Sequence, residues 1–124
     1  MCKIKIILAC RPKMLSDVIR GMVSRQSDME VVCEVVDPIE LLLSVSTTKV
    51  DVVIFTPLSS EGESKICSHL LAESPQIKIV TLLAKGEIAF LYESDAPKKR
   101  IEEPSEKSIL GAIRESLQKT MQIG

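Results

Sequence analysis

Residues 50–56 read VDVVIFT and are followed by Pro57. The stretch is apolar and rich in β-branched residues, it contains one aspartate near its start, and it stops just before a loop. A short apolar run of this kind predicts a strand of a parallel sheet that is buried on both faces. Such a strand brings its last residue, here Thr56, to the carboxyl edge of the sheet, where open α/β proteins place their sites.

Strands and helices alternate on both sides of this stretch. The apolar patterns predict strands over residues 3–9, 30–36, 50–55, 77–83 and 100–102. Helices are predicted from Pro12, from Pro38 to Thr47, across residues 66–71, weakly over residues 87–92, and from Ser105 onward. The second of these helices carries Ile39, Leu42 and Leu43 as its apolar side.

This alternation predicts the fold class. Five strand–helix units in a row favour a parallel sheet that is covered on both faces. Right-handed crossovers then give one α/β domain over residues 1–124, a (βα)5 doubly wound, flavodoxin-like sandwich with a five-stranded parallel sheet of order 2-1-3-4-5.

The composition excludes several kinds of partner. Lys and Arg number 16 against 17 Asp and Glu, so no basic excess indicates nucleic acid, and two Phe and one Tyr offer no stacking platform for single strands. No apolar run approaches the length of a membrane span. The four cysteines form no CxxC pair and no zinc pattern, which is typical of reduced thiols in a cytoplasmic protein. We expect no nucleic-acid binding by this domain, no membrane association, no cofactor and no metal.

In order and spacing, the chain resembles the receiver domains of bacterial response regulators. It is most similar to receivers of two-component regulators that carry a LuxR-type DNA-binding domain. Residues 28–37 (DMEVVCEVVD) resemble their second strand and the start of their second helix, residues 51–56 (DVVIFT) their third strand, and residues 8–12 (LACRP) their first loop. The likeness covers nearly the whole chain and implies a role in signalling or transcriptional regulation.

The resemblance also implies that the phosphorylation centre of a receiver has been lost. The aspartate that accepts the phosphoryl group corresponds to Thr56, and the acidic pair that holds Mg²⁺ corresponds to Ala9 and Cys10, neither of which suits a hard cation. The hydroxyl after the fourth strand is kept, in Thr81. Because phosphoryl transfer needs a nucleophile, a cation and a positive contact together, we expect no Mg²⁺ and no enzyme activity.

A second group of family positions lies near the fifth strand. The family lysine corresponds to Glu103, which precedes Pro104, or to Glu102 if the register slips by one. A carboxylate there would repel a phosphoryl group. The aromatic switch residue two positions earlier corresponds to Ile101.

These losses predict a pseudo-receiver, a phosphorylation-independent module that binds a partner protein or a second copy of itself. Receivers commonly dimerise through the fourth helix, fifth strand and fifth helix. We expect the matching surface here to contain Ile88, Phe90, Leu91, Tyr92 and Ile101. The alternative is that these side chains pack on the sheet.

A rival hypothesis belongs to another functional class. The emptied acidic pocket around Cys10, Thr56 and Thr81 would suit a small-ligand or redox sensor. Arg11 and Lys13 would favour a thiolate at Cys10, although a cysteine that ends an apolar strand is more often inert.

Overall fold

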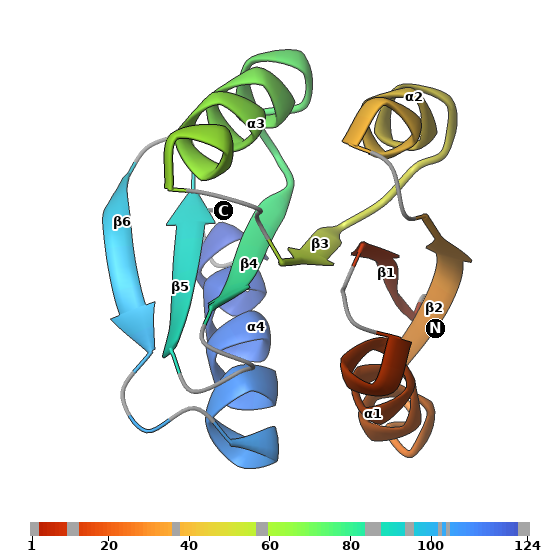
Figure 1. Ribbon diagram of the computed structural model, residues 1–124. Helices are drawn as coiled ribbons and strands as arrows, with labels where there is room; N and C mark the ends of the chain where they lie inside the picture. The colour runs from red at the N-terminus through yellow and green to blue at the C-terminus, as the bar shows by residue number, and fades with distance from the viewer. Residues whose placement is uncertain are drawn as a thin grey trace.

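The computed structural model describes residues 3–9, 13–35, 38–56, 60–83, 88–93, 96–101, 103 and 105–121. It is a six-stranded mixed sheet with two helices on each face (Figure 1). The elements in chain order are β1 (Ile4–Ala9), α1 (Lys13–Ser24), β2 (Met29–Glu34), α2 (Pro38–Thr47), β3 (Val52–Phe55), α3 (Ser60–Glu73), β4 (Lys78–Leu83), β5 (Ile88–Glu93), β6 (Ala96–Ile101) and α4 (Glu106–Met121). No helix in the described ranges is long and apolar enough to cross a bilayer.

The sheet has the strand order β2-β1-β3-β4-β5-β6. The four strands from β2 to β4 are mutually parallel, and their order agrees with the prediction. The last two strands differ from it, because β5 pairs antiparallel with β4 and β6 pairs antiparallel with β5. The α/β class is therefore confirmed, whereas the five-stranded parallel sheet and the (βα)5 order are wrong.

The departure lies at the predicted helix over residues 87–92, because residues 88–93 form strand β5 instead. Six residues are too few for a stable isolated helix. The sequence IAFLYE alternates half-buried Ile88 and Phe90 with buried Ala89 and Leu91, which is the period of a strand. Strand β5 pairs with the free edge of β4, and its aliphatic and aromatic side chains are of the kinds that pack well on a β-sheet.

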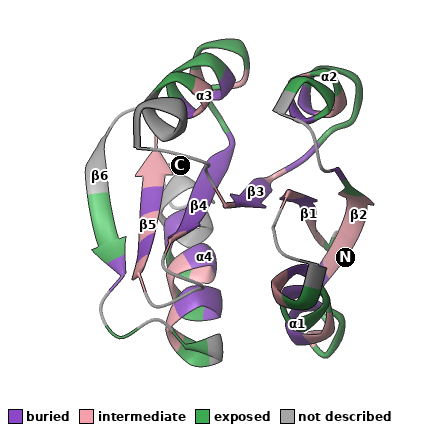
Figure 2. Ribbon diagram, viewed as in Figure 1, coloured by how far each residue is buried: buried purple, intermediate pink, exposed green. Residues whose placement is uncertain are grey.

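Two apolar layers hold the helices on the sheet. Figure 2 shows that the central strands β3 and β4 are buried. Strand β3 is buried on both sides and contributes to both layers, as its sequence predicts. One layer, beneath α1 and α4, includes Ile6, Leu8, Val52, Ile54, Val80, Leu82, Leu91, Ile101 and Ile113. The other, beneath α2 and α3, includes Ile7, Val53, Phe55, Ile79, Leu41, Val45, Cys67 and Leu70.

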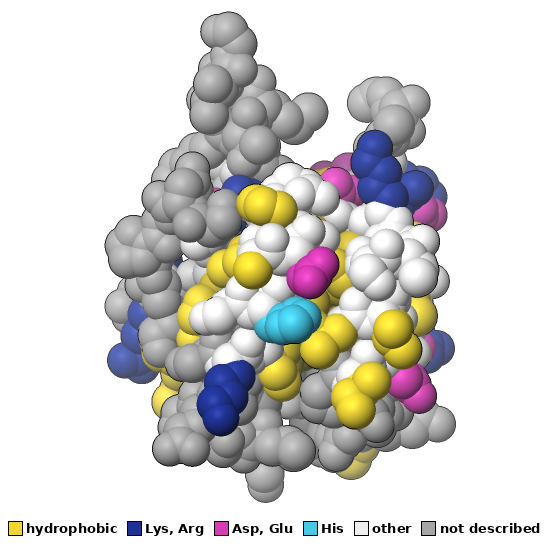
Figure 3. Space-filling model, turned by 90° about the horizontal axis from the view of Figure 1, so that it is seen from above, with side chains coloured by type: hydrophobic (Ala, Val, Ile, Leu, Met, Phe, Trp, Pro, Cys, Tyr) yellow, Lys and Arg dark blue, Asp and Glu magenta, His cyan; other side chains and the backbone are white. Residues whose placement is uncertain are grey.

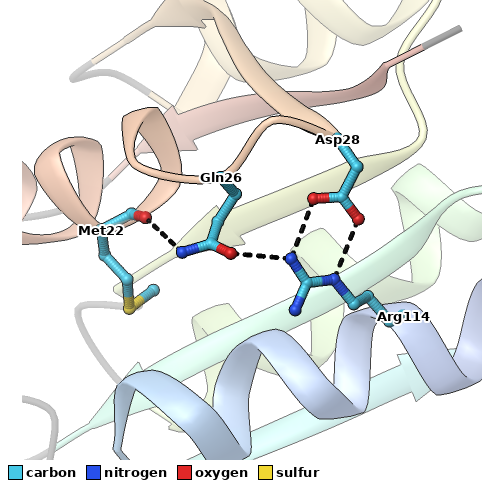
Figure 4. Close-up of polar contacts among 4 residues, drawn as sticks. All are labelled: Met22, Gln26, Asp28 and Arg114. Atoms are coloured by element: carbon cyan, nitrogen blue, oxygen red, sulfur yellow. Dashed lines mark hydrogen bonds and ion pairs between the residues drawn. The ribbon is translucent and has the colours of Figure 1, made fainter.

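A polar network ties α4 to the turn between α1 and β2 (Figure 4). Arg114 donates two hydrogen bonds to the Asp28 carboxylate, at 2.9 and 2.8 Å, and a third to Gln26 Oε1 at 2.8 Å. Gln26 Nε2 in turn points at the Met22 carbonyl, 3.5 Å away. The hydrogen bond from Arg114 lowers the pKa of Asp28, and the same contact raises the pKa of Arg114. This bidentate pair joins segments 86 residues apart in sequence.

Candidate functional site

The carboxyl ends of β1 and β3 lie side by side, as the sequence predicts for neighbouring parallel strands. Ala9 pairs with Phe55 at the ends of these strands, and the Thr56 N–H donates to the Ala9 carbonyl at 3.1 Å. These two positions thus present a methyl group and a half-buried hydroxyl residue. Cys10 lies outside the described residues.

Thr81 does not lie at this edge. Strand β4 continues to Leu83, so Thr81 sits within the strand and is fully buried. In the sheet register it lies between Phe55 on β3 and Phe90 on β5. Among the described residues its Oγ1 has no hydrogen-bond partner. The structure therefore places this hydroxyl within β4, two residues before its end, and not after the strand.

Glu103 lies farther from the centre than the resemblance implies. Strand β6, which precedes it, runs parallel to β4 but is separated from it by β5. Two strand spacings amount to about 10 Å, so the end of β6 is one strand farther away than the fifth strand of the predicted sheet would be. Glu103 is exposed and adopts a left-handed backbone conformation, with φ of 45°. Glu102 lies outside the described residues.

The local role of Glu103 is at the start of α4. Its carbonyl accepts a hydrogen bond from Ser108 Oγ at 3.0 Å. Ser105 Oγ accepts one from the Ser108 N–H at 3.2 Å, and the Ser105 carbonyl accepts one from the Ile109 N–H at 3.0 Å. The prediction that Ser105 caps the last helix is confirmed.

The predicted dimer surface is divided between the two faces of the sheet. Leu91 and Ile101 are buried under α4, with exposed fractions of 5% and 6%. Ile88, Phe90 and Tyr92 alternate with Leu91 along β5 and are half-buried, and Tyr92 packs against the layer beneath α2 and α3. The alternative that these side chains pack on the sheet is confirmed for Leu91, Ile101 and Tyr92.

A groove of about 570 Å³ runs along the edge strand β2, where the Glu34 carboxylate forms an ion pair with Arg20 and accepts a hydrogen bond from Ser16 Oγ at 2.8 Å. This carboxylate is therefore already neutralised. The described ranges contain no group of three or more His, Cys, Asp or Glu side chains that could hold a metal ion.

An exposed apolar surface on α2 and α3 was missed by sequence reasoning. Ile39 and Leu43, both assigned to the buried side of α2, have exposed fractions of 67% and 60%. Leu42 on α2 and Ile66 on α3 are half-buried on the underlying core layer. Figure 3 looks down on these two helices and shows hydrophobic side chains spread over them with few charges between. The signal was in the sequence PIELLLSVST, which has more aliphatic residues than one helix side can bury.

No protein-family model, curated protein or solved structure matches this chain.

Proposed function

We propose that this protein is a phosphorylation-independent, protein-binding pseudo-receiver that acts in signalling or transcriptional regulation and is not an enzyme. The observation that carries the proposal is the exposure of Ile39 and Leu43 on a helix whose one charged residue is Glu40. One turn apart, these side chains form a continuous apolar strip.

The parallel half of the sheet supports the relation to receivers. The order β2-β1-β3-β4 is that of a receiver, and the ends of β1 and β3 meet where a receiver places its acidic groups. The antiparallel hairpin of β5 and β6 differs from the receiver family, so only the parallel strands β2, β1, β3 and β4 support the relation.

The side chains at that edge support an inactive centre. Ala9 offers no ligand for Mg²⁺, and a threonine hydroxyl such as that of Thr56 is a weak nucleophile. Among the described residues, the Thr81 hydroxyl lies in register between two phenylalanines and Glu103 lies beyond a further strand, which supports the absence of phosphoryl transfer.

The energetics favour a binding role for the exposed strip. Full burial of an aliphatic side chain contributes roughly 1.5–3 kcal/mol, so leaving two of them in water on one helix forgoes stability that the fold could otherwise have gained. Exposed apolar patches of this kind typically mark protein–protein contacts.

The small-ligand or redox sensor remains a prediction. The Thr81 hydroxyl is fully buried within the sheet and so cannot line a ligand pocket. Cys10 lies outside the described residues. The described geometry therefore favours the binding module over the sensor.

Site-specific photo-cross-linking tests the proposal. A photoreactive amino acid replaces Leu43, and a matched variant carries it in place of exposed Asp17 on α1, across the sheet. In the cells that produce the protein, we expect adducts of discrete mass from position 43 and none from position 17. Equal labelling at both positions, or none at position 43, would contradict a binding role for this surface.

A further inference from the structure

The exposed side of α3 carries a stripe of charges beside the apolar strip of α2. Lys65, His69 and Glu73 are exposed and follow one another at intervals of four residues, so they lie in a row along the helix. The His69 Nε2 and Glu73 Oε1 atoms are 3.9 Å apart. The row thus has a cation at one end and a carboxylate at the other.

From this pattern, and resting on the proposed function, we infer that the surface formed by Ile39, Leu42, Leu43, Ile66 and the α3 charge row binds a second copy of this chain. The contact is isologous, meaning that the same patch serves both partners. A two-fold axis in the plane of the contact, crossing α3 near His69, sets the two α3 helices antiparallel.

The charges of α3 are complementary to themselves in this arrangement. The two-fold rotation near His69 brings Lys65 of one copy opposite Glu73 of the other. By symmetry, Glu73 of the first copy also lies opposite Lys65 of the second, so the contact contains two such pairs. Within one chain the two residues are eight positions apart, about 12 Å along the helix axis, too far for a direct ion pair. Within the chain, Glu73 has the His69 imidazole at 3.9 Å, which is longer than a hydrogen bond, so Lys65 of a second copy would add a closer ion pair.

The apolar strip supplies the rest of the contact. The same operation places Ile39 and Leu43 of one α2 near the α2 of the other copy, where half-buried Leu42 extends the contact. Aliphatic groups at the centre with charges beside them reproduce the usual division of an interface into an apolar core and a polar rim.

The opposite face of the molecule offers a contrast. Helix α1 also exposes two apolar residues, Met14 and Val18, at 79% and 65%. Its exposed surface, however, includes Asp17 and Arg20 beside them, whereas α2 has Glu40 as its single charge. The pair Met14 and Val18 therefore provides a matched control with the same kind of side chain and similar exposure.

Sedimentation equilibrium over a concentration series, at low ionic strength, tests the inference. We expect the wild type to show a reversible monomer–dimer equilibrium. The double variant Ile39→Ser/Leu43→Ser should raise the dimer Kd at least about tenfold, because it removes the apolar centre. Met14→Ser/Val18→Ser should change Kd less than about twofold, as expected for side chains outside the contact.

Charge reversal tests the antiparallel geometry. Lys65→Glu alone and Glu73→Lys alone should each raise the dimer Kd about tenfold, because either change turns both ion pairs across the contact into pairs of like charges. The combined variant should return within about twofold of the wild type, because the pairs re-form with their signs exchanged. Failure of this rescue would overturn the arrangement.

A strictly monomeric wild type, or a dimer weakened equally by the α1 control, would overturn the self-association. The proposed function is decided separately. Cross-linking of Leu43 to a different protein would keep the binding module while rejecting the second copy as its partner, whereas no cross-link from that position would reject the binding surface itself.

Discussion

Replacement of Thr81 by valine is expected to stabilise the protein. Thr81 is fully buried, lies in register between Phe55 and Phe90, and has an Oγ1 without a hydrogen-bond partner in the described part of the chain. Valine has nearly the same shape and the same preference for strands, and it replaces the hydroxyl with a methyl group.

The magnitude follows from the cost of burying a hydroxyl. A buried polar group without a partner costs about 1–3 kcal/mol in mutational data, and this cost disappears in the variant. We therefore expect Thr81→Val to raise the free energy of unfolding by about 1–2 kcal/mol, which corresponds to an increase in Tm of roughly 3–8 °C for a domain of this size.

Urea unfolding followed by circular dichroism measures this effect. The midpoint should rise while the slope with urea stays constant, since the surface exposed on unfolding is unchanged. Thr48→Val, at an exposed position after α2, serves as the control and should stay within about 0.5 kcal/mol of the wild type. A loss of stability in Thr81→Val would refute the reasoning, because it would mean that the hydroxyl makes a favourable hydrogen bond.

Further predictions concern the contacts that hold the helices and the hairpin. Arg114→Ala should cost about 1 kcal/mol in urea unfolding, because the bidentate pair is partly exposed and water replaces it; no loss would mean that the pair contributes nothing. The lowered pKa of Asp28 adds stability that is present above the unfolded pKa near 3.8 and is lost as pH falls through the lower folded pKa. Asp28→Asn should therefore flatten the acid side of the profile of unfolding free energy against pH, between about pH 5 and 2. An unchanged profile would contradict this. Leu91→Ala should cost about 2–4 kcal/mol because Leu91 is in the core, and a cost below 1 kcal/mol would contradict its burial. Ser105→Ala should cost about 1 kcal/mol through loss of the helix cap, measured in the same urea series, and a neutral effect would contradict the capping role.

The sequence predicted the parallel half of the fold well. The run at residues 50–56 has no helical alternative, since it is short, β-branched and apolar throughout, and it forms the strand β3 that is buried on both faces. The cap at Ser105 was likewise readable, because a serine after a proline and before an apolar-periodic segment favours a helix start.

The hairpin could not be predicted from its pattern alone. In residues 88–93, Ile88, Leu91 and Tyr92 fit the spacing of a helix, while Ile88, Phe90 and Tyr92 fit the alternation of a strand. The choice is made by tertiary contacts, because β4 offers an open edge and the hairpin completes the apolar layer against α4. Because β5 lies between β4 and β6, Glu103 lies one strand farther from β4 than predicted.

The positions of the site residues depended on the strand ends. Ala9 and Thr56 were placed correctly because β1 and β3 end where the sequence indicates. The range predicted for the fourth strand, residues 77–83, already encloses Thr81. What the sequence did not reveal is that β5 pairs with this strand and covers Thr81 from the other side. The exposure of Ile39 and Leu43 depends in the same way on which side of α2 faces the sheet.

Treatment with acetyl phosphate and Mg²⁺, followed by intact-mass measurement and sedimentation of the same sample, tests the central claim most directly. A phosphorylation-independent module should show no phosphate adduct and the same association with and without treatment. A labile adduct of one phosphate, or association that appears only after treatment, would contradict the account.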